Sequence, residues 1–338
     1  MSLPDPYAPN TRRSYSVALK KWTSHRAQSG LPLLLDGPNQ KQVEEVFNFL
    51  LDLRSRSPAL KPQSCRLYLY AVQALHWENN AHFPLNSPAL RLATRSFNLR
   101  TEHKRQDPLL AEDLRRFTTT SMARALTSET SCDSARIWAG ILIAWNALLR
   151  IDELRNLHSK DIFLEWSSGE VRPLRHFSAH LGLPDKVIVA IRQSKTDRNA
   201  SGFTTGCTRT DTEICAVRSL INFVSRGSMR ELPQRPFNLS VYQYTKFIKQ
   251  LAAAIGLEGS FNTHSIRAGG ATSLLIAGVN PRQIMLIGRW KSTAFTSYLR
   301  VSPSITLRQT SDLGLSSLST RMQLAPQTRT PRPPNPSR

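Results

Sequence analysis

Residues 263–300 read THSIRAGGATSLLIAGVNPRQIMLIGRWKSTAFTSYLR, and the rest of the chain is interpreted outward from this stretch. His264 and Arg267 lie three residues apart, so they share one face of a predicted helix. The pair Arg289-Trp290 and then Tyr298 follow along the chain. Taken singly, these groups are more common as surface or core residues, so their meaning depends on what accompanies them.

Two earlier segments contain further polar groups of interest. Residues 147–162 read ALLRIDELRNLHSKDI, in which Arg150 and Glu153 lie three apart at the start of a short predicted helix and share its face. Residues 192–197 read RQSKTD and place Lys195 at the turn of a predicted hairpin. An ordinary helix ion pair and a solvated lysine are the plainer interpretations of each segment alone.

Together these groups suit attack by a phenol oxygen on a phosphodiester. Arg150 and Arg267 could clamp the non-bridging oxygens, because a guanidinium gives permanently charged, bidentate hydrogen bonds to a centre that gains negative charge. Tyr298 could act as the nucleophile and keep the bond energy in a phosphotyrosine, so that resealing requires no ATP.

The remaining groups fit supporting roles in the same reaction. Lys195 could protonate the leaving 5′ oxygen, provided that neighbouring arginines lower its pKa. His264 could hydrogen-bond the phosphate or assist proton transfer, and Glu153 could orient His264 or an arginine. This chemistry needs no metal ion, and no cofactor is expected.

The motifs ALLRIDEL, SKT, HSIRAGGAT and GRWKSTAFTSYLR resemble, in this order, the conserved boxes of the tyrosine recombinase (phage integrase) family. The longer stretch HSIRAGGATSLLIAGVNPRQIMLIGRW is similar to versions found in eukaryotic mobile elements of the Crypton and DIRS type. The resemblance covers residues 108–300, and the preceding residues are similar in kind to the family's core-binding domain.

The resemblance implies a role for each matching residue. The implied catalytic set is Arg150, Glu153, Lys195, His264, Arg267, Trp290 and Tyr298, with Tyr298 as the nucleophile. One position departs from the pattern, because Arg289 stands nine residues before Tyr298, where the family has His or Trp. Trp290 is the favoured substitute, since a local shift would let its indole N–H donate to a phosphate oxygen.

Composition points to a polyanionic partner. The 338 residues include 45 Lys and Arg against 24 Asp and Glu, a formal charge of +21, so double-stranded DNA is the expected partner. Charge alone leaves ribosomal and membrane-surface proteins as alternatives. The spacing of the 4 cysteines suits neither a zinc knuckle nor a disulfide framework, which predicts reduced thiols. Neither a leader peptide nor a membrane span is expected, so the chain is predicted to be soluble and intracellular.

The predicted fold is mainly α with a small antiparallel β-sheet. Residues 1–100 are expected to form a bundle of four helices, which the resemblance makes a SAM-like core-binding domain that contacts DNA. On the second helix, the expected inner face is Val43, Val46, Phe47, Leu50 and Leu51. Residues 101–108, TEHKRQDP, form the predicted linker.

Residues 109–301 are expected to form the catalytic domain, with strands predicted at 161–166 and 186–192. Residues 302–338 are rich in Ser, Thr, Pro and Arg and are predicted to be disordered, apart from a short apolar helix at 313–318 that could dock onto another protomer.

The expected function is therefore site-specific recombination of DNA through a 3′-phosphotyrosine, in integration or transposition of a mobile element. The resemblance implies a homotetramer on paired DNA sites, and a nuclear location if the host is eukaryotic. Two alternatives remain at this point: a catalytically inactive DNA-binding descendant of a recombinase, and a DNA-relaxing enzyme of the type IB topoisomerase kind. The sequence does not specify the DNA target.

Overall fold

A computed structural model describes residues 7, 9–55, 60, 62–99, 106–123, 132–192, 202–226, 232–292, 295–296 and 298–299. Backbone contacts divide the chain into two compact units, residues 1–104 and 105–338. The division falls within the segment predicted as a linker. The tail predicted at 302–338, with its possible helix at 313–318, lies outside the described residues.

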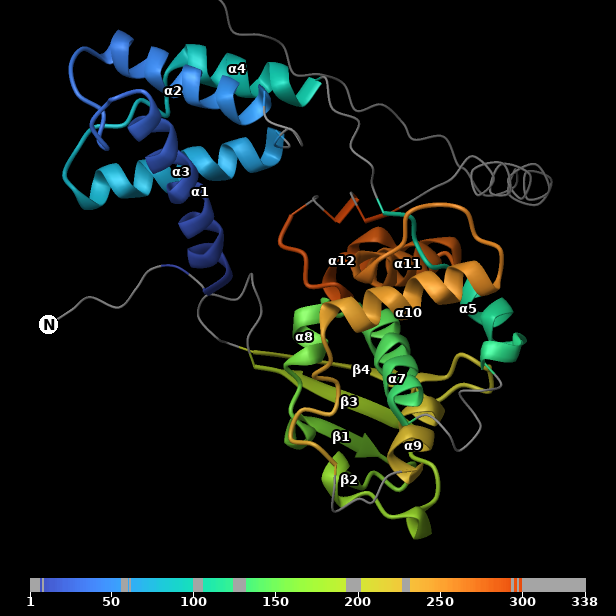
Figure 1. The fold of residues 1–338 in the computed structure, drawn as a ribbon. Coiled ribbons are helices and arrows are strands. Elements are labelled where there is room, and N and C mark those ends of the chain that lie inside the picture. Colours follow the sequence, from blue (N-terminus) through green and yellow to red (C-terminus); the bar gives the residue numbers. More distant parts are fainter. Residues whose placement is uncertain are drawn as a thin grey trace, which may run out of the picture. The chain divides into compact units, whose positions relative to one another are not determined.

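The first unit is helical (Figure 1) and contains α1 Pro9–Gln28, α2 Asn39–Ser55, α3 Pro62–Glu78 and α4 Pro88–Leu99. Its core gathers apolar residues from all of them, including Trp22, Phe49, Val72 and Leu90. Arg26 is buried in this unit, where its guanidinium donates to Glu45 Oε2 at 2.5 Å and lies over the Trp22 ring. The four predicted helices are therefore present, and the buried arginine has a partner for its charge.

The inner face of α2 differs from the predicted one. Phe47 and Leu51 are 38% and 44% exposed, whereas Phe49 and Leu53 are buried beside Val46 and Leu50. The cause is that apolar residues occupy five of the six positions 46–51, with Asn48 the exception, so the helix has more than one possible apolar stripe and neighbouring helices select one of them. The prediction was wrong by about half a turn at these two positions.

The second unit is built mainly from helices. They are α5 Ala111–Thr118, α7 Cys132–Asn146, α8 Ile151–Arg155, α9 Ala216–Arg226, α10 Val241–Ala254, α11 Thr263–Ile276 and α12 Pro281–Ile287. Helix α7 runs through the core (Figure 1), and its residues from Ala139 to Ala144 are almost fully buried. A smaller apolar cluster around Leu148, Ile284, Trp290 and Phe295 lies near the end of the described chain.

A four-stranded antiparallel sheet completes the described part of this unit, in the order β2-β1-β3-β4. Its strands are β1 Ile162–Glu165, β2 Val171–Pro173, β3 Lys186–Ile191 and β4 Phe203–Thr208. Two of them, β1 and β3, match the predicted strands. Because β3 and β4 pair from Ile191 opposite Phe203, the segment that joins them contains Lys195, as predicted for a hairpin.

Two glycines let α11 approach its neighbours closely. A Cβ atom on Gly269 would lie 1.8 Å from the carbonyl oxygen of Leu109, and one on Gly270 would lie 2.2 Å from that of Trp145. Only glycine allows backbones to come this near. The helix that bears Arg267 is thus fixed directly against the end of α7 and the segment before α5.

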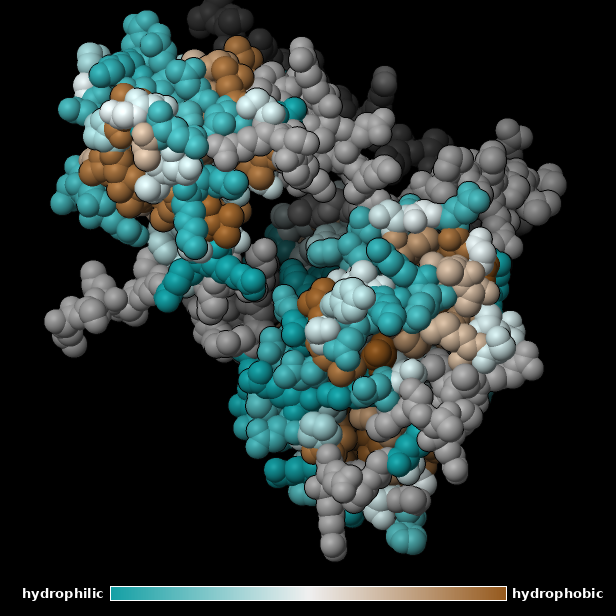
Figure 2. Space-filling view, viewed as in Figure 1, coloured by the Kyte–Doolittle hydropathy of each residue, from teal (hydrophilic) through white to brown (hydrophobic). Residues whose placement is uncertain are grey.

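Hydrophilic residues cover much of the visible described surface of each unit, with smaller hydrophobic areas between them (Figure 2). No described helix has both the length and the apolar character needed to cross a membrane. The buried cysteines Cys65, Cys207 and Cys215 are free thiols.

Candidate active site

Glu153 is the centre of a buried charge cluster in the second unit. Its side chain is 3% exposed, and it accepts from Arg150 twice: the backbone N–H reaches Oε2 at 2.9 Å and Nη1 reaches Oε1 at 2.6 Å. Arg150 occupies the N-cap position of α8, so Glu153 in the first turn folds back onto it as the sequence spacing predicted. The carboxylate therefore fixes the direction of the Arg150 guanidinium.

Arg289 approaches the same carboxylate from the other side. Its Nη2 donates to Glu153 Oε2 at 2.6 Å, and it also donates to the carbonyls of Leu148 at 3.1 Å and Ala147 at 3.2 Å. The backbone of Arg289 has φ 59°, in the left-handed region that non-glycine residues rarely adopt. The Arg289 side chain is buried against Glu153, while the next residue, Trp290, is also buried and packs over Arg267.

Arg267 lies beside this cluster under two aromatic rings. Its Nη1 is 3.8 Å from Glu153 Oε2, and Nη2 donates to the carbonyl of Gly288. Its guanidinium carbon is 4.3 Å from the centre of the Trp290 ring and 5.6 Å from that of the Tyr298 ring. The two rings are themselves 5.1 Å apart, so the predicted nucleophile, arginine and tryptophan are neighbours.

Several buried donors of the site have no hydrogen-bond partner among the described residues: Arg267 Nε and Nη1, Arg289 Nε and Trp290 Nε1. A buried unpaired donor is costly unless something accepts from it. Because Arg267 and Trp290 supply three of these four donors next to Tyr298, this part of the cluster is suited to an anion.

The charges of the cluster shift its pKa values. Burial would raise the pKa of Glu153, but Arg289 and then the hydrogen bonds from Arg150 outweigh it, and the pKa lies below its ordinary 4.5. Burial, followed by the charge of Arg150, lowers the pKa of Arg267 to about 9. Burial also lowers the pKa of Arg289. Three guanidinium groups and one carboxylate leave an excess of positive charge that an anion would offset.

Tyr298 is held by contacts within its own chain. Its backbone N–H donates to Phe295 O at 2.8 Å, and its carbonyl accepts from Thr272 Oγ1 at 3.4 Å. Its ring packs against the cluster of Leu148, Ile284 and Trp290. The side chain remains partly exposed.

Lys195 lies outside the described residues, but both ends of its segment lie near the site. Arg192 and Gly202 line a cavity of about 640 Å³ together with Glu153. Phe203, the first residue of β4, lies 5.4 Å from the guanidinium carbon of Arg289. The hairpin that bears Lys195 therefore begins and ends beside the charge cluster.

His264 is the one described member of the predicted set that the structure does not join to the cluster. Its side chain is exposed, on the first turn of α11, and its backbone N–H donates to the capping side chain of Asn262 at 2.8 Å. Among the described residues, its ring makes no hydrogen bond or ion pair. Glu153 consequently orients arginines rather than His264, one of the two predicted possibilities.

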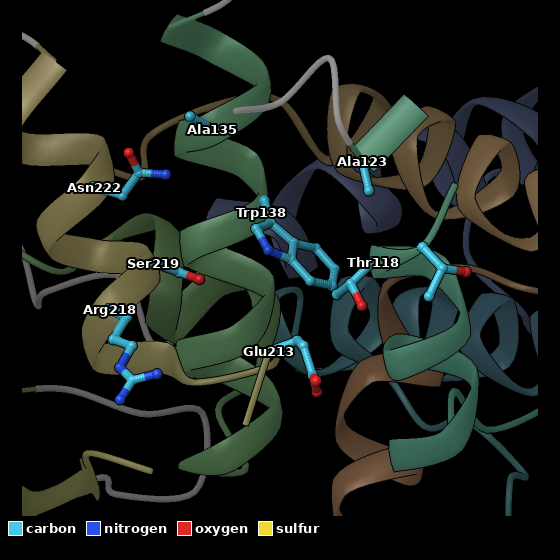
Figure 3. A pocket seen from close by; sticks show the side chains of 9 residues that line it. Thr118, Ala123, Ala135, Trp138, Glu213, Arg218, Ser219 and Asn222 are labelled. Carbon is cyan, nitrogen blue, oxygen red and sulfur yellow. The ribbon is translucent and has the colours of Figure 1, made fainter. Parts of the chain in front are cut away.

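Other features of the second unit lie apart from this cluster. A cavity of about 440 Å³ between α5, α7 and α9 is lined by residues that include Trp138, Arg218 and Asn222, and by none of the predicted site residues (Figure 3). Within the described part of the chain, His, Cys, Asp and Glu side chains form no group able to hold a metal ion.

A helical unit followed by a helix-rich unit with a small antiparallel sheet, and arginines beside a tyrosine, define the tyrosine recombinase class. The sequence profile of the phage integrase family matches residues 113–303. The chain therefore belongs to the phage integrase family. No curated protein sequence matches it.

Solved structures show the same fold at low sequence identity. The Tn1549 transposon integrase in complex with a circular intermediate DNA is 12% identical, with 91% of this chain and 95% of that chain covered and a TM-score of 0.55. The XerH site-specific recombinase bound to a palindromic difH substrate is 15% identical, with 90% and 78% covered and a TM-score of 0.55. A lambda integrase dimer bound to a COC′ core site is 15% identical, with 88% of this chain and 91% of that chain covered and a TM-score of 0.54.

Sequence reasoning did not assign a structural role to Arg289. The sequence marks it only as the residue nine before Tyr298, yet its guanidinium donates to Glu153 and to the carbonyls of Ala147 and Leu148 beside Arg150. Its place in the matched GRW motif was the available signal. That motif does not reveal which group the side chain contacts.

Proposed function

We propose that the chain breaks and rejoins DNA through a covalent bond between Tyr298 and a backbone phosphate. The observation that carries this proposal is the set of buried, unpaired donors of Arg267 and Trp290 beside the Tyr298 ring. Donors of this kind match the non-bridging oxygens of a phosphodiester that gains charge during attack.

In the proposed reaction, the phenol oxygen of Tyr298 forms a bond to phosphorus as the bond to the 5′ oxygen breaks. Arg267 and Arg150 offset the charge on the non-bridging oxygens, and the Trp290 N–H donates to one of them. Lys195 gives a proton to the leaving 5′ oxygen, and the phenol proton passes to His264 or through it to solvent water. Attack by a 5′ hydroxyl reverses these steps and reseals the strand.

The buried state of the donors adds one requirement. Arg267 is 2% exposed and Trp290 is 9% exposed, so a phosphate reaches their donors only if neighbouring side chains move. The Trp290 and Tyr298 rings, which lie against the Arg267 guanidinium, are the groups that would shift. DNA binding would then offset the cost of the unpaired donors and complete the site.

Duplex DNA is the proposed partner, and recombination between two sites the proposed outcome. The formal charge of +21 favours a polyanion, and the described part of the first unit offers exposed Arg66, Arg91 and Arg95 around one cavity. Integration or transposition of a mobile element by a homotetramer on paired sites, in the nucleus of a eukaryotic host, completes this proposal. The family membership and the DNA-bound structural neighbours support the choice of DNA as the partner.

The first experiment tests the nucleophile. The full chain is incubated with a pool of nicked duplexes of randomised sequence, which trap a covalent adduct because the short cleaved fragment diffuses away. We expect an adduct on denaturing gels and a phosphotyrosyl peptide containing Tyr298 by mass spectrometry. Tyr298→Phe should abolish the adduct, whereas Tyr242→Phe, which alters a tyrosine 73% exposed on α10, should leave it intact.

An adduct that persists in Tyr298→Phe would assign the nucleophile to another residue. Sequencing the DNA in the adducts identifies the preferred site, which then serves in a two-duplex assay. Exchange of strands between two duplexes supports a recombinase, relaxation of one supercoiled circle without exchange supports a DNA-relaxing enzyme, and binding without any adduct supports an inactive descendant.

A further inference from the structure

Arg289 connects separate parts of the proposed active site. Its guanidinium donates to Glu153 at 2.6 Å, to the carbonyls of Ala147 and Leu148, which follow the end of α7, and to Ile287 O at 3.3 Å at the end of α12. The guanidinium carbon of Arg289 lies over the ring of Phe203, the residue that begins β4 after the Lys195 segment. One side chain therefore touches the Arg150 segment, the base of the hairpin and the segment before Trp290.

We propose that Arg289 is a positioning residue for DNA cleavage: through Glu153 it aims Arg150 at the phosphate, and its bonds to the carbonyls of residues 147 and 148 hold Arg289 in place for this contact. The inference rests on the proposed function. The inference goes beyond the proposed function because it assigns Arg289 a role away from the phosphate. Trp290 then remains the residue that donates to a phosphate oxygen.

The backbone just before Arg150 is strained and needs contacts that hold it in place. Leu148 has φ 47°, a left-handed conformation that is strained for a residue with a branched side chain. Arg289 itself has a left-handed φ of 59°, and in this conformation it donates to the Leu148 carbonyl at 3.1 Å. The bonds to the carbonyls of residues 147 and 148 anchor the Arg289 guanidinium beside Glu153, and Glu153 in turn holds Arg150.

Charge explains why an arginine suits this place. Glu153 is 3% exposed, and without Arg289 its only close cation would be Arg150 at 2.6 Å, since Arg267 lies 3.8 Å away and makes no hydrogen bond to it. Arg289 makes the largest contribution that lowers the pKa of Glu153, and so it keeps the carboxylate ionised as an acceptor for Arg150. A neutral group at position 289 would leave Glu153 easier to protonate, and a protonated carboxyl accepts less well from Arg150.

Single-turnover cleavage measured against pH tests the inference, on a nicked duplex with the site recovered from adducts. We expect Arg289→Gln to cleave about 100-fold more slowly than wild type at the acidic end of the profile, with partial recovery as the pH rises and Glu153 ionises. Wild type should show no such loss over that range. Arg289→Lys, which keeps the charge, should restore part of the rate at low pH.

A double substitution separates positioning through Glu153 from an independent effect. If Arg289 acts through Glu153, Arg289→Gln should slow Glu153→Gln by less than about threefold, although it slows the wild type by much more. The matched control is Arg209→Gln, which removes an arginine from an ion pair with Asp185 outside the site and should leave the pH profile unchanged.

Two results would overturn the inference: a pH profile of Arg289→Gln parallel to that of wild type, or a rate loss that simply adds to that of Glu153→Gln. A wild-type chain that forms no adduct is a failure of the proposed function instead. In that case, carbon NMR of the full chain with labelled Glu still decides the point, because the pKa of Glu153 should rise in Arg289→Gln and an unchanged pKa refutes the contact.

Discussion

At the scale of single residues, the buried carboxylate of Glu153 is what allows arginines to gather in one place. Arg150, Arg267 and Arg289 would repel one another in a buried site, and one anion offsets part of that repulsion. The cluster keeps a net positive charge, which suits a phosphate. Glu153 thus stabilises the site and also orients the Arg150 guanidinium.

Replacing Glu153 should therefore destabilise the second unit. We expect Glu153→Gln to reduce the free energy of unfolding by about 3–5 kcal/mol, because it leaves buried guanidinium groups without their anion. Chemical denaturation followed by circular dichroism measures this. Glu170→Gln, in an ion pair with Arg172 that is largely exposed, should cost no more than about 1 kcal/mol, and an equal loss in both variants would contradict the argument.

The same substitution predicts a pH dependence. Because the folded pKa of Glu153 is lowered, its contribution is complete above the ordinary carboxyl value of 4.5 and is lost as the pH falls below that value toward the folded pKa. The difference in stability between wild type and Glu153→Gln should therefore shrink below pH 4.5. A difference that stays constant down to pH 3 would be inconsistent with the lowered pKa.

Arg150, Glu153, Arg267 and Tyr298 could be predicted as neighbours because their motifs resemble, in order, the boxes of the tyrosine recombinase family. Spacing alone joins only Arg150 to Glu153. The ambiguity at Arg289 and Trp290 could not be resolved, since counting residues does not reveal a backbone φ of 59°. Both side chains are buried, but Arg289 contacts Glu153 and Trp290 packs over Arg267. For His264, the spacing predicted that its side chain shares a helical face with Arg267, but it could not predict whether the ring contacts the charge cluster.

At the scale of elements, helix α11 depends on the closeness that Gly269 allows. We expect Gly269→Ala to destabilise the second unit by about 1–3 kcal/mol or more, because its Cβ would meet a backbone carbonyl at 1.8 Å that cannot move alone. Urea unfolding measures the effect. Gly140→Ala on α7 should cost less, because its nearest atoms, at 3.0–3.3 Å, belong to side chains that can adjust; a larger loss there would oppose this view.

Helices and strands could be predicted where their sequences have capping residues or a regular spacing of apolar side chains. The helices of the first unit have caps and apolar stripes, and all were found, although α2 turned a different face inward. The hairpin at Lys195 implies a second strand, but the position of that strand, β4 Phe203–Thr208, was not predicted, because Cys207 is its only buried side chain and the other positions show no apolar alternation. It is held by its backbone pairing to β3, which its side chains do not encode.

At the scale of the whole molecule, the question is whether a protomer cleaves with its own tyrosine. The Tyr298 ring packs on Trp290, and its centre lies 5.6 Å from the guanidinium carbon of Arg267 in the same chain, so we expect cleavage in cis. A mixture of Tyr298→Phe and Arg267→Gln chains should then form no more adduct than either variant alone. Mixing each variant with wild-type chains checks that unlike protomers assemble on the DNA. Adduct restored in the mixture would mean that Tyr298 enters the site of a neighbouring protomer, because only exchange could unite an intact arginine with an intact tyrosine.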